Sequence, residues 1–313
     1  MKVLVTGGAG FIGLHTVETL VAQNYEVVVV DHLERDNRTL LDRRVSDYTM
    51  DISSEELPRI FATERPDAVI HLAAQVSVQR SLDSPWLDAK DNIAGTVNVL
   101  KQCVDYGVGK LVFSSSAAVY GNTTELPISE RQLPRPLSFY GASKRMAEDY
   151  IRMFGEWCGL EYTILRYANV YGMRQSTKGE SGVVASFVNQ LLDDKRPCIY
   201  GNGEQTRDFV YVKDVARANV AALTRGSSET LNIGGGKRIS VNELFDLIRD
   251  LSKSSETPEY RAAKEGDIHD SMLDNRRAIS TLEWEPMYTI SDGLSETIRY
   301  ERDILESTLM PWK

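Results

Sequence analysis

Short apolar runs alternate with longer amphipathic segments along the first half of the chain. The apolar runs are continuous, which is typical of strands that are buried on both faces of a parallel sheet, and they span residues 3–6, 26–30, 68–72, 110–114 and 161–166. The helical patterns between them cover about residues 10–23, 88–106 and 138–158. Strands that alternate with helices predict βαβ units, so the expected fold class is α/β with a doubly wound parallel sheet.

The pattern changes after about residue 168. Glycines cluster from there on, and the elements between them are shorter. Residues 209–212 and 214–223 predict one more strand and helix, so the segment at about 206–225 is expected to return to the main sheet. We therefore predict a first part at 1–168 and a smaller, interwoven part at 169–313. No Pro- or Ser-rich linker separates the two parts, so they are expected to pack as one body.

A glycine-rich turn joins the first strand to the first helix. It reads Thr6-Gly-Gly-Ala-Gly-Phe-Ile-Gly13, and such a turn lets the backbone approach a pyrophosphate, which the helix N-terminus attracts. Asp31 ends the second strand, where a carboxylate accepts hydrogen bonds from ribose hydroxyls and repels a 2′-phosphate. These features predict a Rossmann-type domain at 1–168 that prefers NAD to NADP. The residues assigned to the cofactor here are Gly7, Gly10, Phe11, Ile12, Gly13, Asp31 and His32.

The next group of motifs indicates redox chemistry. Ser114-Ser115-Ser116 is followed by Tyr140-Gly-Ala-Ser-Lys144. A tyrosine and a lysine four residues apart lie on one face of a helix, so the ammonium can sit beside the phenol. A free phenol has a pKa of about 10, and a neighbouring cation together with an oxidised nicotinamide favours phenolate. The pattern therefore predicts a nicotinamide enzyme in which Tyr140 is the base.

Further cofactor contacts are expected where other strands end. Asp51 and Ile52 suit the adenine edge and face, although Asp51 suits a helix cap equally well. His71 fits a structural core histidine better than a catalyst. Asn92, a polar residue inside a helical pattern, is assigned to the cofactor site, where it is suited to fixing a neighbouring loop or the surroundings of the lysine. Small residues let the backbone approach a cofactor after residue 71, which adds Leu72, Ala73 and Ala74.

Composition excludes several other classes of function. The net charge of −9 and the sequence pI of about 5.1 argue against a nucleic-acid surface. The three cysteines are widely spaced and form no Cys-x-x-Cys pattern, so we expect neither a metal site nor disulfides, and a reducing compartment. The N-terminus lacks the features of a signal peptide, and no apolar run approaches the ~20 residues of a membrane span. We predict a cytoplasmic protein with no membrane partner.

Several motifs together carry a family resemblance. Beyond those above, the chain contains Phe113-Ser-Ser-Ser-Ala-Ala-Val-Tyr-Gly121, Leu165-Arg-Tyr-Ala-Asn-Val-Tyr-Gly172, Arg207-Asp-Phe-Val-Tyr-Val-Lys-Asp214, Gly266-Asp267 and Leu282-Glu-Trp-Glu-Pro286. In this order they resemble the extended short-chain dehydrogenase/reductases that act on nucleotide sugars, and most closely the UDP-glucose 4-epimerases. The resemblance covers nearly the whole chain. It implies NAD as cofactor, a UDP-hexose as substrate and nucleotide-sugar binding by the part at 169–313.

The resemblance also implies roles for individual residues. Ser116 would hydrogen-bond the 4-oxygen of the sugar, Tyr140 would be the base, and Lys144 would bind the nicotinamide ribose. Ser114, Ser115 and Ala168 fall at positions that line the cofactor. The positions that correspond to substrate contacts are Asn169 for the diphosphate, Arg207 for the phosphates, Cys198 and Tyr200 for the uracil, Asp267 for the ribose, and also Val184, Lys264 and Ser271.

The chain departs from the family pattern in three respects. Dehydratases carry an acidic pair after the catalytic hydroxyl residue, where this chain has Ala117-Ala118, so dehydration is not expected. Lys264 replaces the usual arginine and loses its bidentate fork. Ser271 occupies the position that gates the sugar pocket, where a tyrosine restricts related enzymes to plain hexoses. A serine there would leave room for an N-acetyl group.

The expected reaction is a reversible oxidation at C4 that inverts its configuration. The alternatives are another nucleotide-sugar oxidoreductase or lyase, such as a UDP-glucuronate 4-epimerase, decarboxylase or reductase, and a non-catalytic nucleotide-sensing protein on the same fold. The resemblance further implies a homodimer that pairs the helices at about 88–106 and 138–158. Two apolar stripes suit this pairing, unless they pack only against the sheet of their own chain. The first stripe is Ile93, Val97, Leu100 and Val104, and the second is Met146, Tyr150, Met153 and Trp157.

Overall fold

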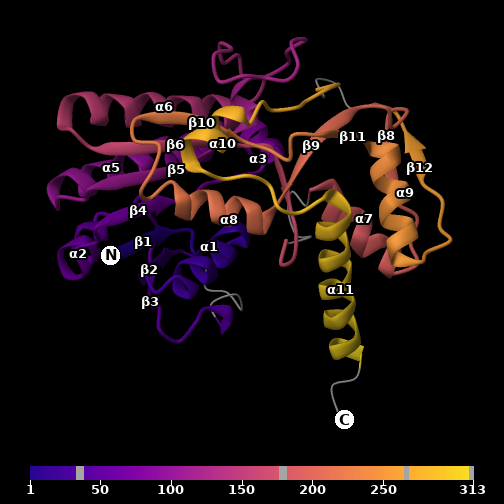
Figure 1. Cartoon of the computed structure of the whole chain (residues 1–313), viewed down its shortest axis with the longest axis horizontal. Helices are drawn as coiled ribbons and strands as arrows, with labels where there is room; N and C mark the ends of the chain where they lie inside the picture. Colours follow the sequence, from indigo (N-terminus) through magenta and orange to yellow (C-terminus); the bar gives the residue numbers. More distant parts are fainter. Residues whose placement is uncertain (33–38, 176–181, 264–267, 310–313) are drawn as a thin grey trace.

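The computed structural model describes residues 1–32, 39–175, 182–263 and 268–309. Its main sheet has seven parallel strands in the order β10-β6-β5-β4-β1-β2-β3 (Figure 1). Every neighbouring pair in this sheet runs parallel. The strands are β1 (Lys2–Thr6), β2 (Glu26–Asp31), β3 (Ser46–Thr49), β4 (Ala68–His71), β5 (Lys110–Ser116), β6 (Glu161–Tyr167) and β10 (Glu229–Ile233).

Helices cover both faces of this sheet. Successive residues of β1 point to opposite faces, so Val3 and Val5 pack in one core and Leu4 packs in another. The first core is completed by α1 (Phe11–Ala22), α8 (Val212–Ala221) and α10 (Arg276–Leu282). The second core is completed by α2 (Leu57–Glu64), α5 (Gly95–Asp105) and α6 (Phe139–Cys158). This doubly wound arrangement confirms the predicted fold class.

The C-terminal residues build a second, smaller body beside the sheet (Figure 1). Its core joins aromatic residues from helices and strands, with Phe187 stacked edge-on against Phe245. The elements are β7 (Asn169–Tyr171), α7 (Val183–Leu192), β8 (Cys198–Tyr200), β9 (Thr206–Tyr211), β11 (Arg238–Ser240), α9 (Val241–Ser252), β12 (Glu259–Arg261) and α11 (Ile290–Leu309). Strands β11, β9 and β7 form a three-stranded sheet, and β12 pairs with β8. The division at residue 168 stays a prediction.

The prediction that the segment 206–225 returns to the main sheet is wrong for its strand. Strand β9 pairs with β7 and β11, because Phe209 and Tyr211 bury their rings in the C-terminal core. The helix that follows, α8, does return and packs on α1. The strand that joins the main sheet is β10, where Leu231 and Ile233 enter the first core.

The predicted helix at 88–106 is confirmed as one unbroken helical run, but it is not α-helical throughout. It consists of α4 (Pro85–Ala89), a π-helical turn η2 (Lys90–Ala94) and α5. A short helix α3 (Val78–Asp83) precedes these elements, and a 3₁₀ turn η3 (Ala117–Val119) follows β5. π-Helical turns are rare and often lie at functional sites. Here the turn carries Asn92, whose contacts are described below.

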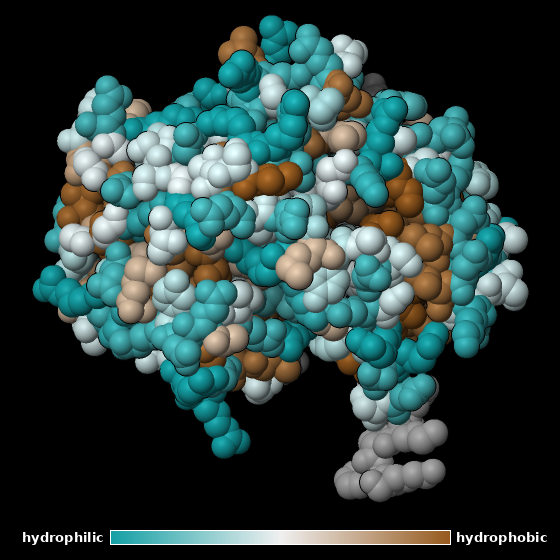
Figure 2. All heavy atoms as spheres, viewed as in Figure 1, coloured by the Kyte–Doolittle hydropathy of each residue, from teal (hydrophilic) through white to brown (hydrophobic). Residues whose placement is uncertain are grey.

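The face of the molecule seen in Figure 2 is largely polar. Figure 2 shows hydrophilic residues over most of the face viewed, with hydrophobic residues in smaller areas between them. Among the described residues, no helix combines the length and apolarity that a membrane crossing requires.

Candidate active site and dinucleotide cradle

The glycine-rich turn between β1 and α1 is shaped by close backbone contacts. Gly7 has a φ of +70°, which favours glycine. A Cβ on Gly7 would lie 2.7 Å from the backbone nitrogen of Ala73, and one on Gly13 would lie 2.1 Å from the carbonyl oxygen of Gly7. The N-terminus of α1 begins after Gly10 with no side-chain cap and no acidic residue in its first turn. The turn therefore fits a pyrophosphate, which needs close backbone approach and free helix N–H groups.

Asp31 stands beside this turn. It is buried at the end of β2, and its Oδ2 accepts a hydrogen bond of 3.0 Å from the backbone N–H of Ala9. The contact holds a carboxylate next to the turn, where the ribose of a dinucleotide would lie. His32, the next residue, is exposed, with its Nδ1 3.8 Å from Asp31 Oδ1. These placements fit the roles predicted for NAD.

The Asp51-Ile52 segment follows β3. Asp51 Oδ1 accepts a hydrogen bond of 2.7 Å from the N–H of Ser53. Burial opposes ionisation of this carboxyl, but the Ser53 bonds and the charge of Lys90 outweigh it and hold the pKa below its usual value. Helix α2 begins after Glu56, so Asp51 closes a turn and is not a helix cap. Ile52 is buried, with its side chain against Gly95.

His71 links three elements of the core and is structural. The Thr96 hydroxyl donates to the carbonyl of Asn92 (2.6 Å), so the Thr96 oxygen must accept from the Nε2–H of His71 (3.0 Å). The other ring nitrogen of His71, Nδ1, therefore has no proton and accepts from the Thr6 hydroxyl (2.6 Å). Burial and the charge of Lys144 lower the pKa of His71 to about 3, so the ring is neutral. The same Thr6 oxygen accepts from the N–H of Ala73. Ala73 is held at the glycine turn in this way, and the N–H of Leu72 donates to the Thr6 carbonyl (3.1 Å). Both are predicted cofactor residues, and Ala74 follows them in the chain.

Asn92 acts on the site through other residues. Its Oδ1 accepts from the N–H of Gln75 (2.8 Å), and its Nδ2 lies 3.0 Å from the Gln75 carbonyl, 3.0 Å from Ser143 Oγ and 3.1 Å from Asp88 Oδ1. These protein groups use the side chain fully. Asn92 therefore fixes the loop after β4 to α6. Fixing a neighbouring loop is one of the two roles suggested for it from the sequence, and its side chain is not directed to a cofactor.

Tyr140, Lys144 and Ser116 lie on two elements that pack together. Ser138 caps α6 by accepting from the N–H of Gly141 (3.1 Å), which places Tyr140 and Lys144 in the first turns of the helix. The buried Lys144 ammonium donates to the carbonyl of Ser114 (2.9 Å). Burial lowers the pKa of Lys144 to about 8, although Asp88 and Glu148 act in the opposite direction. A lysine of this kind remains a cation near neutral pH and is held in one place.

The three serines at the end of β5 have different partners. Ser114 donates to the carbonyl of His71 (3.1 Å), and Ser116 Oγ accepts from the N–H of Ala118 (3.1 Å). Ser115 instead donates to Glu148 Oε1 (2.6 Å) inside the protein. The prediction that Ser115 lines the cofactor is therefore wrong for its hydroxyl, because successive side chains of a strand alternate in direction.

The predicted substrate residues Asn169, Arg207 and Ser271 come together in the C-terminal body. Asn169 Nδ2 donates to the carbonyl of Asp208 (3.1 Å), and the N–H of Ser271 donates to the carbonyl of Thr206 (3.2 Å). Arg207 Nη1 donates to the carbonyls of Thr206 and His269. All of these contacts lie along β9, so one strand organises the proposed diphosphate contacts.

Asp208 holds this region together, although it was not among the residues predicted for the site. It is fully buried and accepts hydrogen bonds from the N–H groups of Gly235 (2.8 Å) and Leu273 (3.1 Å). Burial raises its pKa to about 6, against the effect of these bonds. Its position inside the motif that begins at Arg207 is a signal that could have found it.

The remaining predicted residues are more scattered. Ala168 follows β6 and donates its N–H to Ile233 (2.9 Å). Cys198 and Tyr200 lie on β8, and the side chain of Tyr200 is exposed. Val184 is fully buried in the C-terminal core, which leaves only its backbone for a ligand. Lys264 and Asp267 lie outside the described residues. Within the described ranges, no three His, Cys, Asp or Glu side chains are grouped as a metal site.

Comparison with known proteins agrees with this geometry. Residues 3–234 match the model of the NAD dependent epimerase/dehydratase family. The chain is 37% identical to a UDP-glucose 4-epimerase of Mycolicibacterium smegmatis over 97% of this chain and 99% of the relative. A crystal structure of UDP-glucose 4-epimerase from Thermotoga maritima with UDP-glucose superposes with a TM-score of 0.95 and 44% identity, covering 97% of this chain and all of that one. The Thermus thermophilus UDP-glucose 4-epimerase in complex with NAD gives a TM-score of 0.91 and 38% identity, covering 96% and 99%.

Proposed function

Because the chain belongs to the NAD-dependent epimerase/dehydratase family, we propose that it inverts C4 of a UDP-hexose and so interconverts UDP-glucose and UDP-galactose. The observation that carries this proposal is the intact set of Ser116, Tyr140 and Lys144 beside the Ala117-Ala118 turn. The set can move a proton at a sugar hydroxyl. The two alanines have no group that could eliminate water, which argues against a dehydratase.

Proton transfer falls to Tyr140. Its phenolate accepts the proton of the C4 hydroxyl, and the Lys144 cation stabilises that phenolate. Ser116 Oγ already accepts from the N–H of Ala118, so its own O–H is available to donate to the 4-oxygen of the sugar. NAD, when bound in the glycine cradle, supplies the hydride acceptor and then the hydride donor.

Inversion requires the sugar to turn while its nucleotide stays in place. Asn169 and Arg207 would hold the diphosphate from β7 and β9, in the C-terminal body. The sugar, oxidised at C4, then rotates about its link to the diphosphate and presents its other face. Tyr140 returns the proton as C4 is reduced. The anchoring groups would thus lie on one body and the acid–base groups on the other.

Nuclear magnetic resonance on a panel of UDP-sugars tests this function. We expect UDP-glucose and UDP-galactose to reach the same mixture from either side, with no net release of NADH. Stoichiometric NADH release would instead identify a net oxidoreductase. Epimerisation confined to UDP-glucuronate would identify a UDP-glucuronate 4-epimerase, and release of carbon dioxide from UDP-glucuronate would identify a decarboxylase. Both are alternatives named in the sequence analysis.

We further propose that the enzyme is a homodimer. Four residues on the outer face of α6 are exposed and apolar: Met146, Tyr150, Met153 and Trp157. The stripe expected on α5 does not continue this face, because Leu100 is fully buried in the second core and Val104 packs against it. Exposed apolar residues of α3 and α4 are available in its place, namely Val78, Leu82, Trp86 and Leu87.

Light scattering tests the dimer. The wild type should have twice the mass of one chain at micromolar concentration. The double variant Met153→Lys/Trp157→Lys should be monomeric, because each lysine would bury a charge in the interface. A wild type with the mass of a single chain would contradict the proposed homodimer.

A further inference from the structure

A buried ion pair lies between α6 and the main sheet. Glu148 of α6 and Arg166 of β6 are both buried. Arg166 Nε donates to Glu148 Oε1 (2.8 Å), and Nη2 donates to Oε2 (2.6 Å). This two-pronged geometry gives orientation as well as attraction, because it is satisfied in only one arrangement of the two planar groups.

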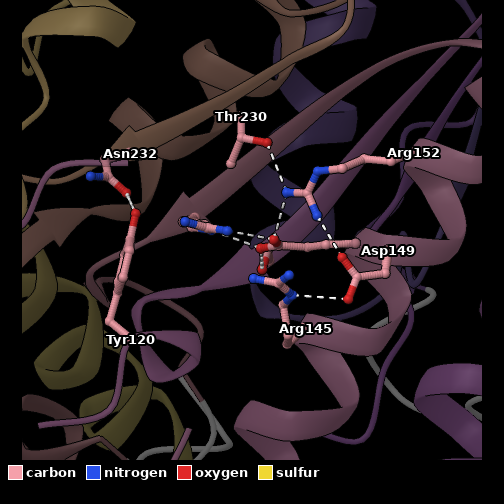
Figure 3. Close-up of polar contacts among 9 residues, drawn as sticks. Tyr120, Arg145, Asp149, Arg152, Thr230 and Asn232 are labelled. Atoms are coloured by element: carbon pink, nitrogen blue, oxygen red, sulfur yellow. Dashed lines mark hydrogen bonds and ion pairs between the residues drawn. The ribbon is translucent and has the colours of Figure 1, made fainter. Parts of the chain in front are cut away.

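The pair belongs to a network that spans α6 and three neighbouring strands. Ser115 of β5 donates to Glu148 Oε1 (2.6 Å). Arg152 donates to Glu148 Oε2 (2.9 Å) and to Thr230 Oγ1 of β10 (3.1 Å). Figure 3 shows Arg152 reaching toward both Thr230 and Asp149. Each carboxylate oxygen of Glu148 therefore has two donors, and those donors come from β5, β6 and the next turn of α6.

The far side of Arg166 is also held. Its guanidinium carbon lies 4.7 Å from the centre of the Tyr120 ring. The Tyr120 hydroxyl donates to Asn232 Oδ1 of β10 (2.7 Å), as Figure 3 shows. Arg166 is in register with Ser115 on one side and with Asn232 on the other. The arginine is thus fixed along the strand direction as well as toward the helix.

Stability alone does not account for such an arrangement. A buried ion pair is often no more stabilising than well-packed apolar residues of the same volume, although removing one partner is strongly destabilising. Apolar contacts between a helix and a sheet tolerate small shifts, whereas a two-pronged ion pair does not. The network is better suited to setting where α6 sits on the sheet than to adding stability.

The network lies beside the proposed catalytic residues. Tyr140, Lys144 and Glu148 follow one another at intervals of four residues, so they share one face of α6. On β5, Ser115 stands between Ser114, whose carbonyl binds Lys144, and Ser116. We propose that Glu148 and Arg166 are positioning residues, which fix α6 against β5 so that Tyr140 and Lys144 face Ser116 in the reactive arrangement. This inference rests on the proposed function, because that function gives those three residues their roles.

The network also sets the charge around Lys144. The groups that face this ammonium are Asp88 from α4, His71 from β4, the Phe113 ring from β5 and Glu148 from α6 itself. Removing the charge of Glu148 takes away one of the two carboxylates and leaves Arg166 as an uncompensated cation. Both changes disfavour protonated Lys144. The pH range in which the enzyme works should therefore move to lower pH.

The test uses the full-length enzyme and two substitutions of different severity. Glu148→Gln removes the charge but keeps the shape, and Ser115→Ala removes only the link from the carboxylate to β5. We measure kcat and KM per NAD-loaded chain, using the UDP-sugar that the wild type epimerises fastest. We also measure the pH dependence of kcat and KM, and the thermal unfolding of each variant. The control is Asp149→Asn, since Asp149 pairs with Arg145 and Arg152 at the exposed edge of the same network.

We expect kcat to fall about 10- to 100-fold in Glu148→Gln, as for a small misplacement of reacting groups, with KM little changed. The alkaline limb of its pH profile should lie at lower pH than in the wild type. Ser115→Ala should lower kcat less and leave the pH profile in place. The double variant should be no slower than Glu148→Gln, because the serine acts through the glutamate. Asp149→Asn should match the wild type.

Each contrary result has a distinct meaning. A wild-type kcat in Glu148→Gln, or a lowered kcat with the alkaline limb in its original place, overturns the positioning role. If Glu148→Gln does not fold, Ser115→Ala decides alone, and a wild-type kcat in it overturns the inference. If the wild type epimerises no UDP-sugar, the proposed function is wrong. This result is obtained before any variant is made, so it is distinct from a failure of the positioning role.

Discussion

The close approach of Gly7 to Ala73 gives a prediction whose size follows from the structure. Gly7→Ala places a methyl group at a φ of +70°, 2.7 Å from the Ala73 nitrogen, 2.9 Å from its Cα and 3.0 Å from the Leu72 carbonyl carbon. Real Cβ atoms essentially never approach backbone so closely. The alanine at position 7 must either leave the left-handed region or push the loop that follows β4 away from the glycine turn.

Two costs add in this variant. A left-handed conformation costs a non-glycine residue about 1–2 kcal/mol, and forcing an extra methyl group into a packed site costs about 1–3 kcal/mol. We therefore expect Gly7→Ala to lower the free energy of unfolding by about 2–5 kcal/mol. The Ala73 segment is a proposed wall of the cofactor site, so NAD affinity should fall as well.

Gly107→Ala separates these two costs. Gly107 has nearly the same φ of +68°, but a Cβ there meets nothing within 4 Å. Its loss should be about 1–2 kcal/mol, from the backbone alone, with unchanged NAD affinity. Urea unfolding and calorimetric titration with NAD measure both quantities. Equal loss of stability in the two variants, or NAD affinity unaffected in Gly7→Ala, would refute the steric argument.

Four further predictions follow from the site. Tyr140→Phe should lower kcat by more than about tenfold, or ~1.4 kcal/mol, in steady-state assays while NAD stays bound, and a smaller loss would show that another group is the base. The wild type should bind NAD at least about tenfold more tightly than NADP in titrations, and Asp31→Asn should narrow the gap; equal wild-type affinities would contradict the carboxylate–ribose contact. Activity should decline as pH rises through about 8, where Lys144 loses the proton that stabilises phenolate, and a pH–rate profile that is level across that range would assign the lysine a different role. Ser271→Tyr should suppress epimerisation of UDP-N-acetylglucosamine but spare UDP-glucose in the NMR assay, because bulk penalises only the larger sugar, and equal loss of both would show that Ser271 is not the gate.

Features within one element could be predicted from the sequence. The glycine turn, the carboxylate at the end of β2 and the Tyr140–Lys144 spacing depend on a strand, a turn or a helix face, whose geometry is the same in every protein. The structural role of His71 could also be predicted, because a histidine within an apolar strand is buried; its neutral state follows from the structure. These features were enough to indicate a dinucleotide enzyme with a tyrosine base.

Features that depend on contacts between elements required the tertiary structure. The apolar run at 209–212 predicted a strand but not its sheet, and only the packing of Phe209 and Tyr211 against the C-terminal core shows that β9 leaves the main sheet. Polar residues interrupt β10, so its place at the edge of the main sheet also required the structure. The partner of Ser115, Glu148, lies on a helix whose position the strand pattern does not specify, and the role of Asp208 depends on loops that meet around it. Residue spacing along a chain determines which side chains share one face of an element, but it does not determine which faces meet, since that depends on how all the elements pack together.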